Sequence, residues 1–123
     1  MSDPRPELQS ELDLLLGTAI NSLAKLEALL YLYARPGAVQ SAADIAAALR
    51  RPTEGLAPEL DALAEAGLLD RFPLGTGRHV VYGAAEDEHV QALMSLLHER
   101  HGRSPAALIR QAAAGERGAS TGE

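Results

Sequence analysis

The fold is decided by the stretch LDALAEAGLLDRF, residues 60–72. Its first half continues an apolar helical face, because leucine recurs at i, i+4 and i+7 at positions 56, 60 and 63. Gly67 ends this helix, since glycine readily adopts the left-handed capping conformation. The period then changes, and residues 69–72 and 78–82 are typical of two short strands around the turn Leu-Gly-Thr-Gly. The stretch therefore predicts a helix that leads directly into a β-hairpin.

Three helices are predicted before this stretch. Leucines at helical spacing predict helices over residues 8–19 and 22–34, and the run Arg-Pro-Gly at 35–37 ends the second. Ser41 is a suitable N-cap for a short helix over 42–49. The turn Arg-Arg-Pro follows, and Thr53 is the predicted N-cap of the leucine-rich helix, which extends to Ala66.

Two helices are predicted after the hairpin. The acidic run Glu-Asp-Glu at 86–88 favours a helix N-terminus through the helix dipole, and that helix ends near Gly102. The pair Ser104-Pro105 starts a last helix that ends near residue 114. We expect a disordered leader over 1–7, one domain over 8–114 and a disordered tail over 115–123.

This order of elements resembles the winged helix-turn-helix regulators of the MarR and ArsR type. The resemblance covers residues 22–101 and rests on residues 26–32 (LEALLYL), 43–49 (ADIAAAL) and 60–69, and on the closing Val-Tyr pair at 81–82. It implies a mainly α fold with a small β-hairpin (α+β), and a DNA-binding transcriptional regulator. Residues 87–90 resemble the start of an ArsR-type dimerisation helix, which implies a homodimer through the first and post-wing helices. The alternative is that these helices only cover the core of one domain.

The composition limits the function classes. The chain has 123 residues, enough for one domain, and 46% of them are hydrophobic. It has no cysteine, which excludes disulfides and thiolate metal sites. No apolar run is long enough for a membrane span, and the acidic, proline-rich start is unlike a signal peptide, so we expect a cytoplasmic protein without a membrane partner.

The resemblance also indicates which residues contact DNA. In such folds the helix after the turn enters the major groove, while the turn and the wing contact phosphates. The matching candidates here are Arg50, Arg51, Thr53, Arg71, Arg78 and His79. The alternative for these cations is that they are solvated loop charges.

The charge of the leucine-rich helix conflicts with DNA binding. From residue 53 to residue 70 the chain has five acidic residues and no Lys or Arg, and the net charge of the whole chain is −6. The residues expected to point outward are Glu54, Gly55, Ala57, Pro58, Glu59 and Asp61. Pro58 is also expected to displace or kink the start of the helix. The alternative function is therefore a protein-interaction module that presents this acidic helix, the third helix of the region resembling the winged helix-turn-helix, to a basic protein partner.

Metal binding and catalysis are not expected. Asp87, His89, His98 and His101 are similar to the ligand pairs of ArsR-type metal sensors. The spacing of nine residues from His89 to His98, however, places these two side chains on opposite faces of a helix. No nucleophile with a base, phosphate-binding loop or carboxylate pair is evident. The sequence therefore predicts a protein that is not an enzyme and holds no metal or cofactor.

Overall fold

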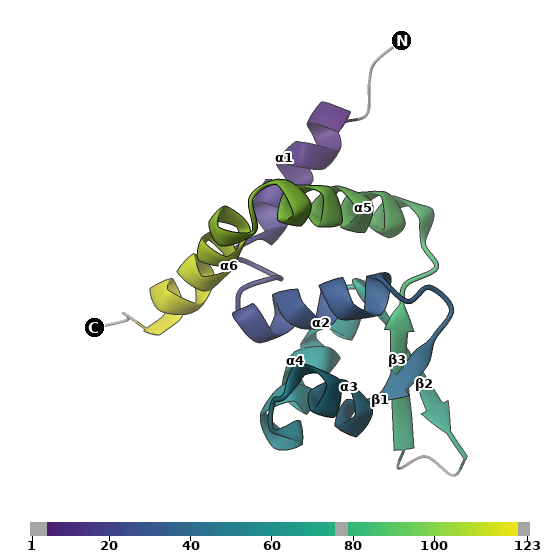
Figure 1. Ribbon diagram of the computed structural model, residues 1–123. Helices are drawn as coiled ribbons and strands as arrows, with labels where there is room; N and C mark the ends of the chain where they lie inside the picture. Colours follow the sequence, from purple (N-terminus) through teal and green to yellow (C-terminus); the bar gives the residue numbers. More distant parts are fainter. Residues whose placement is uncertain (1–4, 76–78, 121–123) are drawn as a thin grey trace.

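The computed structural model describes residues 5–75 and 79–120, and only the backbone of 115–120. Six helices and three strands follow one another along this part of the chain (Figure 1). Their bounds are α1 (Arg5–Leu15), α2 (Leu23–Tyr33), β1 (Val39–Ser41), α3 (Ala42–Leu49), α4 (Thr53–Glu65), β2 (Leu69–Leu74), β3 (His79–Ala84), α5 (Glu88–Arg103) and α6 (Pro105–Ser120). The predicted order of helices with a hairpin after the fourth is confirmed.

The strands form a three-stranded antiparallel sheet in the order β1-β3-β2. The predicted hairpin is β2 and β3, with Leu69 opposite Ala84 and Leu74 opposite His79. Strand β1 was not predicted, because three residues are too few to show an alternating pattern. It pairs with the far edge of β3, where Val39 lies opposite Gly83. The wing is therefore joined to the segment that leads into α3.

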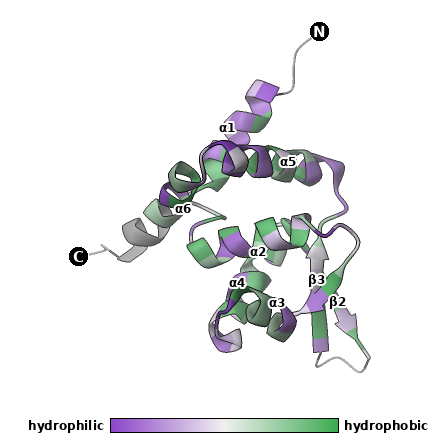
Figure 2. Cartoon of the chain, in the orientation of Figure 1, coloured by the Kyte–Doolittle hydropathy of each residue, from purple (hydrophilic) through white to green (hydrophobic). Residues whose placement is uncertain are grey.

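The helices lie in two layers, with α2 between them. Helices α1, α5 and α6 lie on one side of α2, and α3 and α4 lie on the other, next to the sheet (Figure 1). Hydrophobic residues concentrate along α2, whereas the outer end of α1 is hydrophilic (Figure 2). The buried side chains of α2 include Leu26, Leu29 and Leu32, each fully inaccessible to solvent. This core holds α4 through its own buried leucines, Leu56, Leu60 and Leu63, as predicted.

The start of α4 differs from the prediction in two ways. Pro52, not Thr53, occupies the N-cap position, and it supplies no side-chain hydrogen bond. Its φ of −65° and ψ of 135° give the extended conformation of a cap, so Thr53 already belongs to the first helical turn. Pro58 lies inside α4 and does not displace the helix start. Only one hydrogen bond within the helix requires the missing N–H, and the buried leucine face holds the helix around it.

The terminal helices extend beyond their predicted ends. Helix α1 begins at Arg5, within the predicted leader, and α6 continues to Ser120, within the predicted tail. Proline is tolerated in a first helical turn, which is where Pro6 lies. Residues 16–22 form a turn between α1 and α2, in which Gly17 has a φ of +97°. In the described part of the chain, no helix combines the length and the hydropathy that a bilayer crossing requires.

Candidate nucleic-acid interface

The turn between α3 and α4 places two cations beside the start of α4. Arg50 has φ 57° and ψ 48°, and its backbone N–H bonds to the carbonyls of Ala46 and Ala47, which ends α3. This left-handed conformation costs a non-glycine residue roughly 1–2 kcal/mol. The Arg50 side chain is exposed, whereas Arg51 Nε donates to Glu27 Oε1 on α2 at 2.8 Å. Arg50 is therefore the freer of the two cations.

The first turn of α4 continues this corner of the molecule. Thr53 is exposed, and no side chain caps the helix N-terminus because Pro52 occupies the cap position. The leading N–H groups of a helix carry a partial positive charge and bind anions. The structure thus brings three predicted site residues, Arg50, Arg51 and Thr53, to one helix N-terminus.

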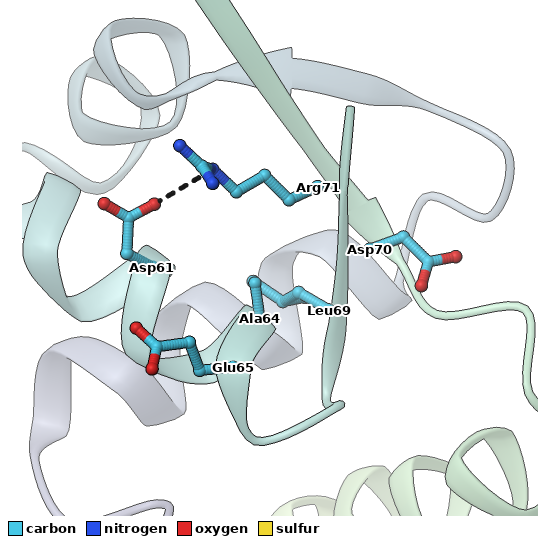
Figure 3. Close-up of a pocket in the computed structure, with 6 residues that line it drawn as sticks. All are labelled: Asp61, Ala64, Glu65, Leu69, Asp70 and Arg71. Atoms are coloured by element: carbon cyan, nitrogen blue, oxygen red, sulfur yellow. Dashed lines mark ion pairs between the residues drawn. The ribbon is translucent and has the colours of Figure 1, made fainter. Parts of the chain in front are cut away.

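The wing supplies the other predicted cations. Arg71 on β2 points towards α4, and its Nε lies 3.3 Å from Asp61 Oδ1 (Figure 3). His79 is exposed at the start of β3. Arg78 lies outside the described residues. Arg71 is therefore engaged within the molecule, while His79 is free to face solvent.

Two acidic residues of α4 that were expected to point outward make internal contacts instead. Glu59 Oε2 lies 3.4 Å from Nζ of Lys25, and Glu59 Oε1 accepts a hydrogen bond from Ser22 Oγ at 3.4 Å. Asp61 Oδ1 accepts a hydrogen bond from Tyr82 Oη at 2.5 Å, in addition to its contact with Arg71. Both carboxylates are half-buried. Both were expected to point outward on the helix; in the structure each is paired with a cation of another element, and their side chains keep 30% (Glu59) and 45% (Asp61) exposure.

Lys25 makes a buried contact with α4 that was not predicted from the sequence. It is one of two buried polar or charged residues in the described part of the chain, at 9% exposure, and its Nζ also donates to Asn21 Oδ1 at 2.7 Å. The signal was present in the sequence, because Lys25 lies four and seven residues before Leu29 and Leu32 and so shares their face. A single lysine on a leucine face requires a carboxylate partner, and Glu59 provides it.

Two tyrosines hold the wing against the helices. Tyr33 Oη donates to the Leu68 carbonyl at 2.7 Å and accepts from the Ala85 N–H at 2.9 Å, so it joins both ends of the hairpin to α2. Burial raises the pKa of Tyr33, with a smaller contribution from Asp70. Burial also raises the pKa of Tyr82, and so does its hydrogen bond to the Asp61 carboxylate. Both phenols therefore stay neutral donors at physiological pH.

A groove lies between α4 and the wing. This open groove of about 460 Å³ is lined by Asp61, Ala64, Glu65, Leu69, Asp70 and Arg71 (Figure 3). Asp61 and Glu65 lie on the α4 side of the groove with Arg71, whereas the Asp70 side chain points away from it, so the groove repels a phosphate except beside Arg71 (Figure 3). Glu54, exposed in the first turn of α4, takes part in no ion pair with any described residue.

The histidines and Asp87 have local roles in the structure. Asp87 Oδ1 accepts from the Val90 N–H and caps α5, and His89 Nε2 lies 2.7 Å from Glu11 Oε1. His98 Nε2 is buried and has no hydrogen-bond partner among the described residues. Burial lowers the pKa of His98, and the nearby His101 lowers it further. Within residues 5–75 and 79–120, no three His, Asp or Glu side chains cluster as metal ligands.

Comparisons with known proteins place the fold. No protein-family model matches the sequence, and no curated protein matches it. The solved structures that match include MepR, a transcription regulator of the Staphylococcus aureus multidrug efflux pump MepA, at 21% identity over 87% of this chain and 77% of MepR, with a TM-score of 0.58. The S. aureus MepR–DNA complex matches at 20% identity over 94% of this chain and 93% of that chain, with a TM-score of 0.58. Reduced HlyU from Vibrio cholerae matches at 22% identity over 79% of this chain and 96% of that chain, with a TM-score of 0.56. The chain therefore has the winged helix-turn-helix fold that is found in the regulator MepR.

Proposed function

We propose that this chain is a DNA-binding transcriptional regulator, and that the corner formed by Arg50, Arg51 and Thr53 is its main phosphate contact. The observation that carries the proposal is the uncapped N-terminus of α4 directly after an exposed arginine. Backbone N–H groups and guanidinium donors then converge on one anion position. The likeness in fold to a structure solved with DNA supports the same assignment.

The internal pairing of α4 also supports DNA binding. Glu59 is paired with Lys25 and Asp61 with Arg71, so Glu54 and Glu65 are the acidic residues of α4 without an ion-pair partner among the described residues. The repulsion between this helix and a phosphate backbone is therefore smaller than the sequence count indicates. Arg71, Arg78 and His79 on the wing are proposed as secondary contacts, with Arg71 exchanging Asp61 for a phosphate.

The proposal is tested by the salt dependence of binding to mixed-sequence duplex DNA, measured by fluorescence anisotropy. The affinity should fall with salt by roughly one logarithmic unit per phosphate neutralised, and Arg50→Gln should reduce that slope by about one. Arg110→Gln is the matched control, because Arg110 is an exposed arginine on α6, away from α4 (Figure 1). An equal effect of both variants would refute the assignment of the corner.

We propose that the regulator acts as a homodimer through α1, α5 and α6. Two of the exposed large hydrophobic side chains support this, Leu14 on α1 at 69% exposure and Ile109 on α6 at 37%. Sedimentation at micromolar concentration should give about twice the chain mass of 13.0 kDa. Leu14→Ser should shift the equilibrium towards monomer. A monomer at all concentrations would refute the dimer. The helices α1, α5 and α6 would then only cover the core of one domain.

The second candidate function is a protein-interaction module that uses α4 against a basic partner. The acidic groove beside α4 favours it. Glu54→Gln separates the two functions, because Glu54 is exposed and forms no ion pair with a described residue. This change should strengthen DNA binding by removing one repulsive charge. An interaction module would bind no DNA at moderate salt, with or without the change.

A further inference from the structure

The outer face of the wing sheet is apolar and has no partner within the described chain. Residues directly opposite one another in an antiparallel pair share a face. The register therefore places Val39 with Gly83, and Phe72 with Val81, on one face. The other face contains Tyr82 and Arg71, both in contact with Asp61 of α4. The Val39–Phe72 face thus points away from α4.

This face is unusually exposed for its side chains. Val39 is 52% exposed, Phe72 39% and Leu74 50%, and these are three of the five exposed large hydrophobic residues in the described chain. The other two lie on α1 and α6, the helices proposed to form the dimer. Contiguous apolar patches of this kind mark contact surfaces, whereas single exposed apolar residues do not.

A groove crosses this face. It encloses about 120 Å³, and its lining includes Val39, Phe72, Gly83, Glu86 and Gln91. Gly83 forms the floor, where a Cβ atom would lie 3.1 Å from Val39 Cγ1 and 3.1 Å from the Ala38 carbonyl oxygen. Glycine at this position lets Val39 lie close over β3. The groove is large enough for one aliphatic or aromatic side chain inserted edge-on.

The rim of the groove is acidic. Glu86 lines it and is exposed. Asp70 lies opposite Gly83 on β2 and so shares its face, and Asp70 Oδ2 accepts from the Glu86 N–H at 3.2 Å. Among the described residues that line the groove there is no Lys, Arg or His. A phosphate backbone is repelled here, whereas a cationic side chain beside an apolar one is complementary to both parts of the surface.

We infer that the outer face of the wing is a docking site for an extended segment of a protein partner, in which an apolar side chain fills the groove and an adjacent Lys or Arg meets Glu86 and Asp70. This surface is distinct from the corner at Arg50 and from the acidic groove of α4. The inference does not depend on the proposed phosphate contact at Arg50, which lies in the turn between α3 and α4. His79, a proposed secondary DNA contact, lies opposite Leu74 and so belongs to this face, but at the opposite end of the strand pairing from Gly83 and the groove.

The test uses two synthetic peptides of identical apolar pattern, acetyl-Lys-Phe-Lys-Leu-Lys-amide and acetyl-Glu-Phe-Glu-Leu-Glu-amide. Each is titrated into the ¹⁵N-labelled full chain and followed by NMR. The basic peptide should cause saturable shifts at the amides of Val39, Phe72, Gly83 and Glu86, and the acidic peptide should cause none. The absence of saturable shifts up to about 5 mM peptide would overturn the inference, since even weak binding of about −4 kcal/mol saturates in that range.

Variants decide whether the groove itself is the site. Phe72→Ser should weaken binding of the basic peptide about five-fold by removing part of the apolar contact, and Val39→Ser gives a second, independent removal. Leu14→Ser removes an exposed leucine from α1, outside the wing, and should leave the peptide affinity per chain unchanged whatever its effect on dimerisation. The inference would be overturned if the amide signal of Glu65 shifted in place of that of Gly83, or if Phe72→Ser bound the basic peptide as tightly as the parent protein does. DNA affinity should be the same for Phe72→Ser as for the parent, and its loss would assign this face to DNA.

Discussion

Replacing Glu59 with glutamine tests how α4 is fixed against α2. In the parent protein the Glu59 carboxylate faces the Lys25 ammonium at 3.4 Å, and the Lys25 side chain is 11% exposed while that of Glu59 is 30% exposed. Glu59→Gln removes the negative charge and leaves the buried ammonium with neutral oxygen partners only, Asn21 Oδ1 and the new amide oxygen. Lys25→Met removes the buried charge itself and keeps most of the aliphatic packing.

The two substitutions should differ in magnitude because the two charges differ in burial. Breaking a fully buried ion pair costs about 3–5 kcal/mol, and an exposed pair contributes about 0–1 kcal/mol. The Lys25–Glu59 pair lies between these limits, so we expect Glu59→Gln to lower the free energy of unfolding by about 2 kcal/mol. After Lys25→Met, Glu59 can be hydrated and keeps the Ser22 hydroxyl, so the loss should be below about 1 kcal/mol.

Urea unfolding followed by circular dichroism measures both losses, and the double variant completes the cycle. Glu27→Gln is the matched control, because Glu27 pairs with Arg51 at 2.8 Å with both side chains about one-third exposed. It should cost less than about 1 kcal/mol. A loss for Lys25→Met equal to or larger than that for Glu59→Gln would refute the reasoning from burial.

Three further predictions concern single residues. Because Arg50 has a left-handed conformation, Arg50→Gly should be about 1 kcal/mol more stable than Arg50→Ala in urea unfolding; equal stability would mean that this conformation carries no cost. Tyr82→Phe removes the donor to Asp61 and should lower the free energy of unfolding by about 1 kcal/mol in the same assay, whereas Tyr31→Phe, a half-buried phenol bonded to Gln40, should cost less. Burial lowers the pKa of His98, so the unfolded chain takes up a proton at His98 that the folded chain does not as pH falls below about 6.5. The free energy of unfolding should therefore fall more steeply from pH 7 to pH 5 in the parent than in His98→Gln, and parallel curves would contradict this.

The parts of the fold that were predictable are those with a local pattern. Leucine spacing and Gly67 suffice to place α4 and the hairpin, because helix and strand periods are properties of neighbouring residues. The N-cap of α4 was missed by one residue, since Pro52 adopts the cap conformation without a hydroxyl to signal it. Strand β1 was missed because its partner Gly83 lies more than forty residues away, and three residues have no period of their own.

The site was less predictable than the fold because its charges are paired across long separations. Lys25 and Glu59, like Asp61 and Tyr82, are brought together by the crossing of elements and not by sequence spacing. Counting the charges along α4 therefore gave the correct number of acidic residues, but it did not show which of them are paired within the molecule. Lys25 is the one cation on the leucine face of α2. It was therefore the only local indication that an acidic residue of another element lies beside this face.

The paired and unpaired charges lie on different faces of the molecule, so the DNA and the protein segment proposed above would bind at different places. Arg50 lies beside an uncapped helix N-terminus, where an anion gains both a guanidinium and backbone donors. Glu86 and Asp70 lie beside an apolar groove on the far face of the wing, where an anion is excluded and a cation is accepted. A net charge of −6 is thus compatible with the proposed DNA binding, because Glu59 and Asp61 are paired with Lys25 and Arg71, and Glu86 and Asp70 lie on the far face of the wing. If DNA binds at Arg50 as proposed, neutralising Glu86 should leave the DNA affinity unchanged, whereas neutralising Glu54 beside Arg50 should raise it.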